Sequence, residues 1–396
     1  MVYSAESRDT LAHEHLAKAA QLQPKSAAAH SNLATNLVRL HKLASAEAEF
    51  DQALRLDPAS YDSNHNLGEF YIVSGKIPAA VSYLEAAQRL DPAAYDNGYD
   101  LSLAYLETGR INEARDVVHK LLIQKNTAEL HNLLAQIAET SGDYLPAVNE
   151  YETAAQMDPS ESNLFDWGSE LLLHRTLDPA VEVFRAASER YPNSPRLAAG
   201  LGMALYSRAN YDDAVKALLK AADLNPVDAR CYYFLSKAYD SSPTQTEAVI
   251  QRLRRFADLQ PSNAHAVFYY AMGLWKGRRA EDGKLDGAQI ESLLRRAVAL
   301  DPNFAEARLQ LGNLYSDERK YSQAIPEYQR ALQVNPSLAD AHYRLGQAYV
   351  HTGQKELAQK EIEIYQRVRA EHMAEVDKQR AEIRQFVFSE REAAKQ

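Results

Sequence analysis

The organisation of this chain is decided by residues 302–336, which read PNFAEARLQLGNLYSDERKYSQAIPEYQRALQVNP. A small residue, Gly312, stands ten places after the first proline, and Ala324 stands twelve places before the last. Large side chains such as Leu311 and Tyr315 recur at intervals of three or four residues, which is the period of a helix with one buried face. The segment therefore predicts two short helices that approach closely where their side chains are small.

The same phase recurs along the 396 residues. Nine of the 15 prolines follow one another at steps of 33 to 41 residues, when Asn126 is counted in the place of a missing one. They are Pro24, Pro58, Pro92, Pro159, Pro192, Pro226, Pro261, Pro302 and Pro336. Between the two helices of a unit stand Gly75, Gly109, Gly142 and Gly353. Glycine there tolerates the left-handed backbone that ends many helices.

This spacing of Leu, Gly, Tyr, Ala, Phe and Pro resembles the tetratricopeptide repeat family, from about Leu11 to Tyr365. The resemblance implies an all-α fold, a right-handed superhelical α-solenoid of about ten helix-turn-helix repeats. It divides the chain into an N-terminal half-repeat or capping helix at 1–26, a repeat array at 27–365 and a charged C-terminal capping helix at 366–396.

The repeats depart from the family pattern at several places. The family's Trp at the fourth place is missing, and His30, Asn64, Gly98 and Ala198 stand there. Asn126 replaces a proline, the turn at 241–244 is rebuilt, and seven extra residues lie within an insertion at 277–287. In the C-terminal segment, Val376, Ile383, Phe386, Val387 and Phe388 predict an apolar surface that folds back on the array or pairs with a second chain.

The composition excludes several classes of partner. A net charge of −10 argues against a nucleic-acid partner, which needs a basic surface. No apolar run reaches membrane-spanning length, so we expect no membrane insertion. We expect a soluble protein of undetermined compartment, cytoplasmic or, if a signal peptide was removed, periplasmic. Cys231 is the only cysteine, which excludes a disulfide framework within one chain.

No motif predicts an enzyme, a cofactor or a metal. Gly200-Leu201-Gly202 resembles part of a dinucleotide fingerprint, but no strand precedes it, and Gly202 is the repeat's packing residue. The loop at 282–287 resembles part of a calcium loop, but Lys284 replaces a carboxylate. Both are interpreted as repeat structure.

The family resemblance implies that the first helix of each unit lines a ligand groove. Asn32 and Asn66 occupy equivalent places, followed by Asp100, and resemble the start of the asparagine ladder of O-linked N-acetylglucosamine transferase. Such amides can hydrogen-bond a peptide backbone. Leu133 ends the run, and the alternative is ordinary helix-surface amides.

A second candidate set lies in the middle and later units. Its aromatic members are Phe165, Tyr206, Tyr233, Phe268, Tyr269 and Trp275, and its basic members are Arg196, Arg230, Lys237 and Lys276. Aromatic residues supply much of the energy of interfaces, and the basic residues would select an acidic partner. The alternative is solvated surface charge.

Three hypotheses follow. The first is a scaffold that binds a peptide or protein segment in the concave groove of the superhelix. The second is a structural protein that assembles through its edges or, as a homo-oligomer, through its C-terminal helix. The third is the repeat arm of a larger enzyme or sensor, which the half-repeat at residues 1–26 suggests.

Overall fold

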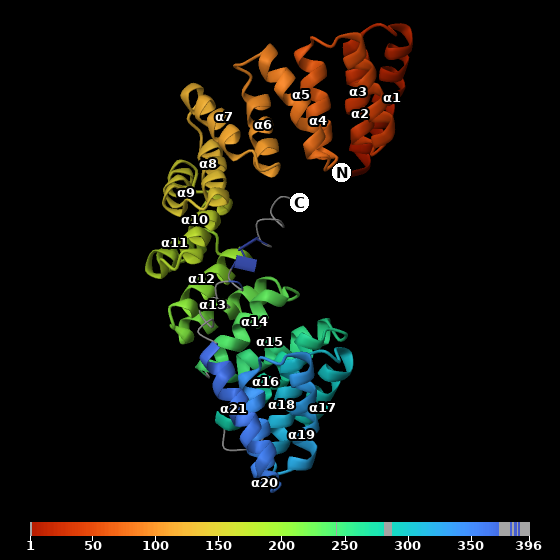
Figure 1. The fold of residues 1–396 in the computed structure, drawn as a ribbon. Helices are drawn as coiled ribbons and strands as arrows, with labels where there is room; N and C mark the ends of the chain where they lie inside the picture. Colours follow the sequence, from red (N-terminus) through yellow and green to blue (C-terminus); the bar gives the residue numbers. More distant parts are fainter. Residues whose placement is uncertain are drawn as a thin grey trace. The chain divides into compact units, whose positions relative to one another are not determined.

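The computed structural model describes residues 2–242, 244–280, 287–371, 381, 384–385 and 387–388. The chain divides into two compact units, Met1–Pro159 and Ser160–Gln396. Figure 1 shows that helices consecutive in the sequence lie side by side within each unit.

Unit 1 is made of consecutive α-helices. They are α1 (Val2–Leu22), α2 (Ala27–Arg39), α3 (Leu43–Leu56), α4 (Tyr61–Val73), α5 (Ile77–Leu90), α6 (Tyr95–Glu107), α7 (Ile111–Gln124), α8 (Ala128–Ser141) and α9 (Tyr144–Met157). After α1 the helices form four pairs, α2 with α3 through α8 with α9, in which each helix packs mainly on its sequence neighbours.

Unit 2 continues the pattern. Its helices are α10 (Glu161–Leu173), α11 (Leu177–Arg190), α12 (Pro195–Ser207), α13 (Tyr211–Leu224), α14 (Ala229–Ser241), α15 (Thr246–Leu259), α16 (Ala264–Ala280), α17 (Gly287–Leu300), α18 (Ala305–Asp317), α19 (Tyr321–Val334), α20 (Ala339–His351) and α21 (Lys355–Glu371). In sequence order they form six pairs, which makes ten in the described part of the chain, although α14 packs mainly on α13 and α16 rather than on its partner α15. The predicted all-α solenoid of helix-turn-helix repeats is confirmed.

The small residues serve the close packing that their spacing predicts. A Cβ atom built on Gly68 would lie 2.6 Å from Leu84 Cδ2, and one built on Gly312 would lie 2.6 Å from Tyr328 Cε1. Leu84 and Tyr328 are fully buried on the second helices of the same pairs. In both pairs, one large side chain therefore packs directly on the backbone of the facing helix at the glycine.

The turn between the helices of a pair needs a left-handed residue. Gly75, Gly109, Gly142 and Gly353 have φ between 70° and 80°, as the sequence predicts. The same turn also contains residues with a side chain at positive φ, which the sequence did not reveal: His41, Arg175, Ala209, Gln245 and Arg319, with φ of 54° to 63°. The repeat geometry therefore imposes a left-handed backbone even on residues whose Cβ atom disfavours it.

Replacing Ala209 with glycine is expected to raise the free energy of unfolding by about 0.5–1 kcal/mol. The left-handed backbone costs a residue with a Cβ about 1–2 kcal/mol, and the added freedom of the unfolded glycine cancels part of the gain. Urea unfolding followed by circular dichroism measures the change. Ala48→Gly, in an exposed position of α3, should lower stability by about 1 kcal/mol. Two losses of similar size would contradict the strain at Ala209.

The fourth place of the repeat joins the two helices of a pair to the preceding proline. The side chains of five residues there donate to the carbonyl of the proline six places earlier, at 3.0–3.3 Å: His30, Asn64, Tyr232, Arg308 and His342. Four residues at this place also pair with a glutamate nineteen places later, at 2.5–3.1 Å: His30 with Glu49, His131 with Glu150, Arg308 with Glu327 and His342 with Glu361. In these units, polar contacts thus occupy the place of the missing tryptophan.

The departures from the pattern have local solutions. Where Asn126 replaces proline, its side-chain oxygen lies 2.6 Å from His131 Nε2 and takes over the role of the proline carbonyl. In the rebuilt unit, Phe256 replaces a small residue and stacks on Tyr232, with ring centroids 4.2 Å apart. At the insertion, α16 runs on to Ala280, while residues 281–286 lie outside the described residues.

The C-terminal segment is described in part. Helix α21 continues past Tyr365 to Glu371. Val376, Ile383 and Phe386, three of the residues expected to form an apolar surface, lie outside the described residues. Val387 is buried and Phe388 is exposed.

Candidate binding surfaces

A cavity of about 360 Å³ opens on the first helices of three consecutive repeats. The residues that line it come from α14, α16 and α18, with Phe304 from the loop before α18. They are Tyr233, Ser236, Lys237, Tyr239, Asp240, His265, Phe268, Tyr269, Met272, Gly273, Lys276, Phe304, Glu306 and Gln310. We call it the first-helix groove. Five residues of the second candidate set line it: Tyr233, Lys237, Phe268, Tyr269 and Lys276.

Aromatic side chains build its wall. Tyr233 is half-buried, and its ring centroid lies 6.4 Å from that of Tyr269. Phe268 is also half-buried and lies 4.9 Å from Phe304, which in turn lies 4.3 Å from the imidazole of His265. Tyr269 and Phe304 are buried and support Tyr233 and Phe268, whose rings keep part of their surface open, which suits these two to hold an apolar side chain of a ligand.

The charges of the groove are balanced. Lys276 Nζ donates to the Asp240 carbonyl oxygen at 2.6 Å and lies 3.6 Å from its carboxylate. Lys237 is exposed, and its Nζ lies 5.7 Å from the centroid of the Tyr233 ring. No carboxylate among the described residues lies within ion-pair distance of Lys237. Because Asp240 and Glu306 offset the two lysines, the groove itself has no strong preference for an acidic partner.

Two of the predicted groove residues are core residues. Phe165 is 0% exposed and meets Phe184 edge to face, with centroids 5.9 Å apart. Trp275 is 5% exposed and belongs to the core cluster around α16–α20. The expectation that these two side chains face a groove needs correction, because packing against the second helices and the next repeat covers both.

Three further residues of the set lie outside this groove. Arg196 Nε donates to Glu161 at 2.8 Å and its guanidinium lies over the Phe165 ring, while Arg230 is paired with Asp228 at 2.8 Å. Tyr206 is half-buried, with its ring 5.9 Å from that of Phe234. Both arginines are thus largely neutralised by their own neighbours.

Unit 1 carries the polar set. Asn32 is exposed and Asn66 is half-buried, and neither amide has a hydrogen-bond partner among the described residues. Asp100 is half-buried one repeat further on; burial raises the pKa of its carboxyl to about 6, against the lowering effect of His65. Leu133, at the next equivalent place, is buried. Asn32 and Asn66 therefore remain available to bond a peptide backbone.

Sequence reasoning missed several groove residues: His265, Met272, Phe304, Glu306 and Gln310. The signal for two of them was present, because His265 and Met272 lie three and four places from Phe268 on one helix face. Phe304 and Gln310 belong to the next repeat, and only the packing of that repeat beside the preceding one brings them to the groove.

The glycines that resemble a dinucleotide fingerprint and the single cysteine both have structural explanations. A Cβ on Gly200 would lie 2.5 Å from Phe184, and one on Gly202 would lie 2.5 Å from Leu218, so both glycines serve helix packing. Cys231 is 2% exposed, and burial raises the pKa of its thiol, which disfavours the nucleophilic thiolate.

The comparison with protein families agrees with this architecture. Models described as "TPR repeat" and "Tetratricopeptide repeat" match residues 31–95, 72–137, 128–161, 165–229, 200–264 and 317–353, which together span well over half of the chain. This chain belongs to the tetratricopeptide repeat family. The repeats that hold the first-helix groove lie partly within the matched segments, since α14 falls inside residues 200–264.

Curated relatives are distant and longer. The chain is 26% identical over 234 residues to the TPR repeat-containing protein YpiA of Bacillus subtilis, covering 59% of this chain and 45% of that protein. It is 24% identical over 176 residues to the mouse protein O-mannosyl-transferase TMTC3, covering 41% of this chain and 18% of that protein. The chain thus spans less than half the length of either relative.

Among solved structures, the C-terminal part of a TPR repeat-containing protein from Cytophaga hutchinsonii is similar, with a TM-score of 0.50 and 14% identity. The match covers 61% of this chain and 96% of that one, and it shows the shared fold. Within the described ranges, every helix is too short or too polar to cross a membrane.

Proposed function

We propose that this tetratricopeptide repeat protein binds an extended peptide segment of another protein in the first-helix groove. The observation that carries the proposal is the cavity of about 360 Å³ on α14, α16 and α18, whose wall includes the half-buried rings of Tyr233 and Phe268. A volume of this size accommodates one or two side chains of a ligand. The family fold, a scaffold for protein interaction, supports the same role.

The residues divide the work of recognition. Tyr233 and Phe268 contribute apolar surface that becomes buried when a ligand side chain enters. Gln310 and Ser236 line the same cavity and can bond peptide N–H and C=O groups. Lys237, exposed at its edge, provides one charge for a carboxylate of the ligand.

Alanine at Tyr233 or Phe268 is expected to weaken peptide binding about tenfold or more, because aromatic anchors at the centre of an interface contribute most of its energy. The probe is a twelve-residue peptide selected from a random library on the full chain, and calorimetry measures its affinity for each variant. Circular dichroism checks that the variants remain helical.

Tyr144→Ala is the matched control, because Tyr144 is an exposed tyrosine on the second helix α9. It should change the affinity by less than about twofold. Selected peptides that bind the Tyr233 and Phe268 variants as tightly as the original chain would place recognition elsewhere and contradict the proposal.

In unit 1 we propose a separate role for Asn32 and Asn66 as backbone-binding amides. Their support is the lack of partners within the described part of the chain, and their equivalent places on α2 and α4. A peptide that depends on them should lose affinity in Asn66→Ala without a change in its sequence preference.

A second candidate function is suggested by the mouse relative, which is named as a transferase and of which this chain covers 18%. The repeat array would then be the substrate- or partner-binding arm of a larger enzyme. Translation of the genomic sequence on both sides of this chain tests that alternative directly.

A further inference from the structure

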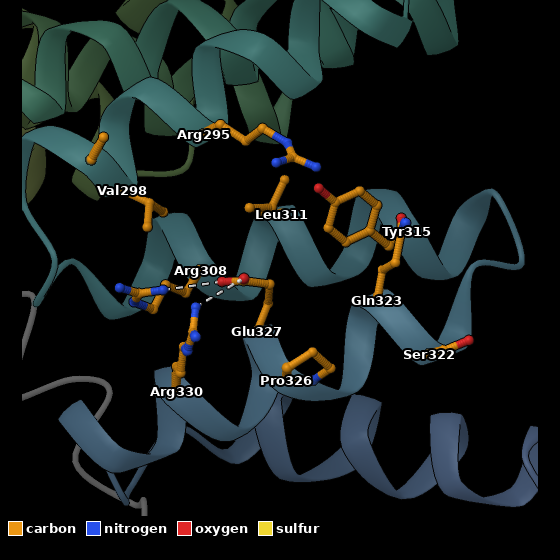
Figure 2. Close-up of a pocket in the computed structure, with 11 residues that line it drawn as sticks. Arg295, Val298, Arg308, Leu311, Tyr315, Ser322, Gln323, Pro326, Glu327 and Arg330 are labelled. Carbon is orange, nitrogen blue, oxygen red and sulfur yellow. Dashed lines mark hydrogen bonds and ion pairs between the residues drawn. The ribbon is translucent and has the colours of Figure 1, made fainter.

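A second cavity, of about 470 Å³, lies between the second helices α17 and α19, on the outer side of α18. Figure 2 shows Arg295 reaching over it from α17, Leu311 and Tyr315 on α18, and Ser322 to Arg330 along α19. This outer cavity is lined by residues of two consecutive repeats and contains no residue of the first-helix groove.

The outer cavity has a small excess of positive charge. Three arginines line it, Arg295, Arg308 and Arg330, against the single carboxylate of Glu327. Glu327 is engaged by Arg308 at 3.1 Å and more loosely by Arg330 at 3.6 Å. The side chain of Arg330 is 60% exposed, so most of its donors face water. In a protein of net charge −10, this is a local excess of guanidinium groups.

Arg295 lies on the opposite side of the cavity, and the carboxylate of Glu291 offsets its charge. Its guanidinium is held by Glu291, which does not line the cavity, at 2.9 Å, and its side chain is 60% exposed. Tyr315 donates its hydroxyl to the same carboxylate at 3.0 Å. Glu291 therefore fixes the position of Arg295. Figure 2 shows that the guanidinium group of Arg295 extends toward the cavity.

One wall of the cavity breaks a rule of helix construction. Pro326 lies inside α19, where it has no N–H to donate to the carbonyl of Ser322, four residues earlier. Both residues line the cavity. Proteins keep such unfavourable residues mainly where they serve a site.

We propose that the outer cavity binds an acidic, extended segment of a second protein, with carboxylates of Asp or Glu side chains on Arg330 and Arg295. Guanidinium groups pair with carboxylates through two parallel hydrogen bonds. Arg295 and Arg330 come from different helices on opposite sides of the cavity, so a segment with two or more carboxylates suits them better than one small inorganic anion. From Ser322 to Arg330 the wall measures about 12 Å, the length of three or four extended residues.

The experiment uses the full chain and a fluorescein-labelled peptide of six consecutive glutamates, followed by fluorescence polarisation. Arg330→Ala is expected to raise the dissociation constant about tenfold, as the loss of one charge-assisted pair predicts. Arg330→Lys should recover only part of the affinity, because an ammonium group cannot form the bidentate pair. Arg254→Ala is the control: Arg254 is 68% exposed on α15 and away from the cavity. It should alter the constant less than about twofold.

Equal losses in Arg330→Ala and Arg254→Ala would reduce the binding to general charge attraction and overturn the proposal. Displacement of the peptide by inorganic phosphate, beyond the effect of sodium chloride at equal ionic strength, would overturn the assignment to a protein segment. Tyr233→Ala separates the two sites, since it should weaken the groove ligand and leave hexaglutamate binding unchanged.

Discussion

Replacing Phe184 with alanine is expected to lower the free energy of unfolding by about 3–5 kcal/mol, the range for removing a buried phenylalanine. Phe184 is 0% exposed on α11 and meets the ring of Phe165. Its ring also fills the space above two glycines of different repeats. A Cβ would lie 2.9 Å from it at Gly168, on α10, and 2.5 Å from it at Gly200, on α12. One side chain therefore holds two repeats together.

Urea unfolding measures the loss, with Leu259→Ala as the control. Leu259 is 50% exposed on α15, so its truncation should change stability by less than about 0.5 kcal/mol. A reciprocal change tests the mechanism. Gly200→Ala should cost about 1–3 kcal/mol by overpacking, and much of that cost should vanish in a Phe184→Leu background, where the ring is absent. Additive effects would show that Phe184 and Gly200 do not share one packing site.

The parts of this fold that were predictable from the sequence depend on contacts close in the chain. The small residue ten places after each proline and the large residue opposite it, such as Gly312 and Tyr328, belong to one helix pair. Their fixed spacing can therefore be recognised in the sequence alone. The left-handed turn was visible only where glycine occupies it. At Ala209 and Arg175 the same backbone is imposed by the packing of the two helices, which no local propensity reports.

The candidate site was predictable only in part, for a related reason. Tyr233 and Phe268 lie on first helices that are open on one side, so their place in the repeat correctly predicted that their side chains are partly exposed. Helix α10 differs, because Asn163, Phe165 and Glu170 are all buried and the helix is covered on more than one face. Its place in the repeat could not show that. The outer cavity was missed altogether, because its arginines come from three helices and form no motif.

The fourth place of the repeat leads to the second large expected effect: Glu327→Ala should destabilise the protein by about 3 kcal/mol. Arg308 and Glu327 are an ion pair whose side chains are 11% and 15% exposed. Removing the carboxylate leaves a buried guanidinium with a carbonyl, that of Pro302, but without a counter-charge. Breaking a buried pair in this way typically costs about 3–5 kcal/mol. The nearby opening of the outer cavity to water favours the lower end of that range.

The chain contains its own control for this prediction. His342 and Glu361 occupy the same two places two helices later, 2.6 Å apart, and His342 also bonds the carbonyl of Pro336. Unlike a guanidinium, an imidazole that loses its carboxylate can release a proton and become neutral while it keeps its bond to the Pro336 carbonyl, so Glu361→Ala should cost only about 1 kcal/mol. Urea unfolding at pH 7.5 compares the two variants. Equal costs would mean that the buried charge of Arg308 is not what Glu327 compensates, and that both glutamates act through hydrogen bonds alone. The double variant Arg308→Met, Glu327→Leu should lie close to the original stability, because it removes both charges and keeps the volume.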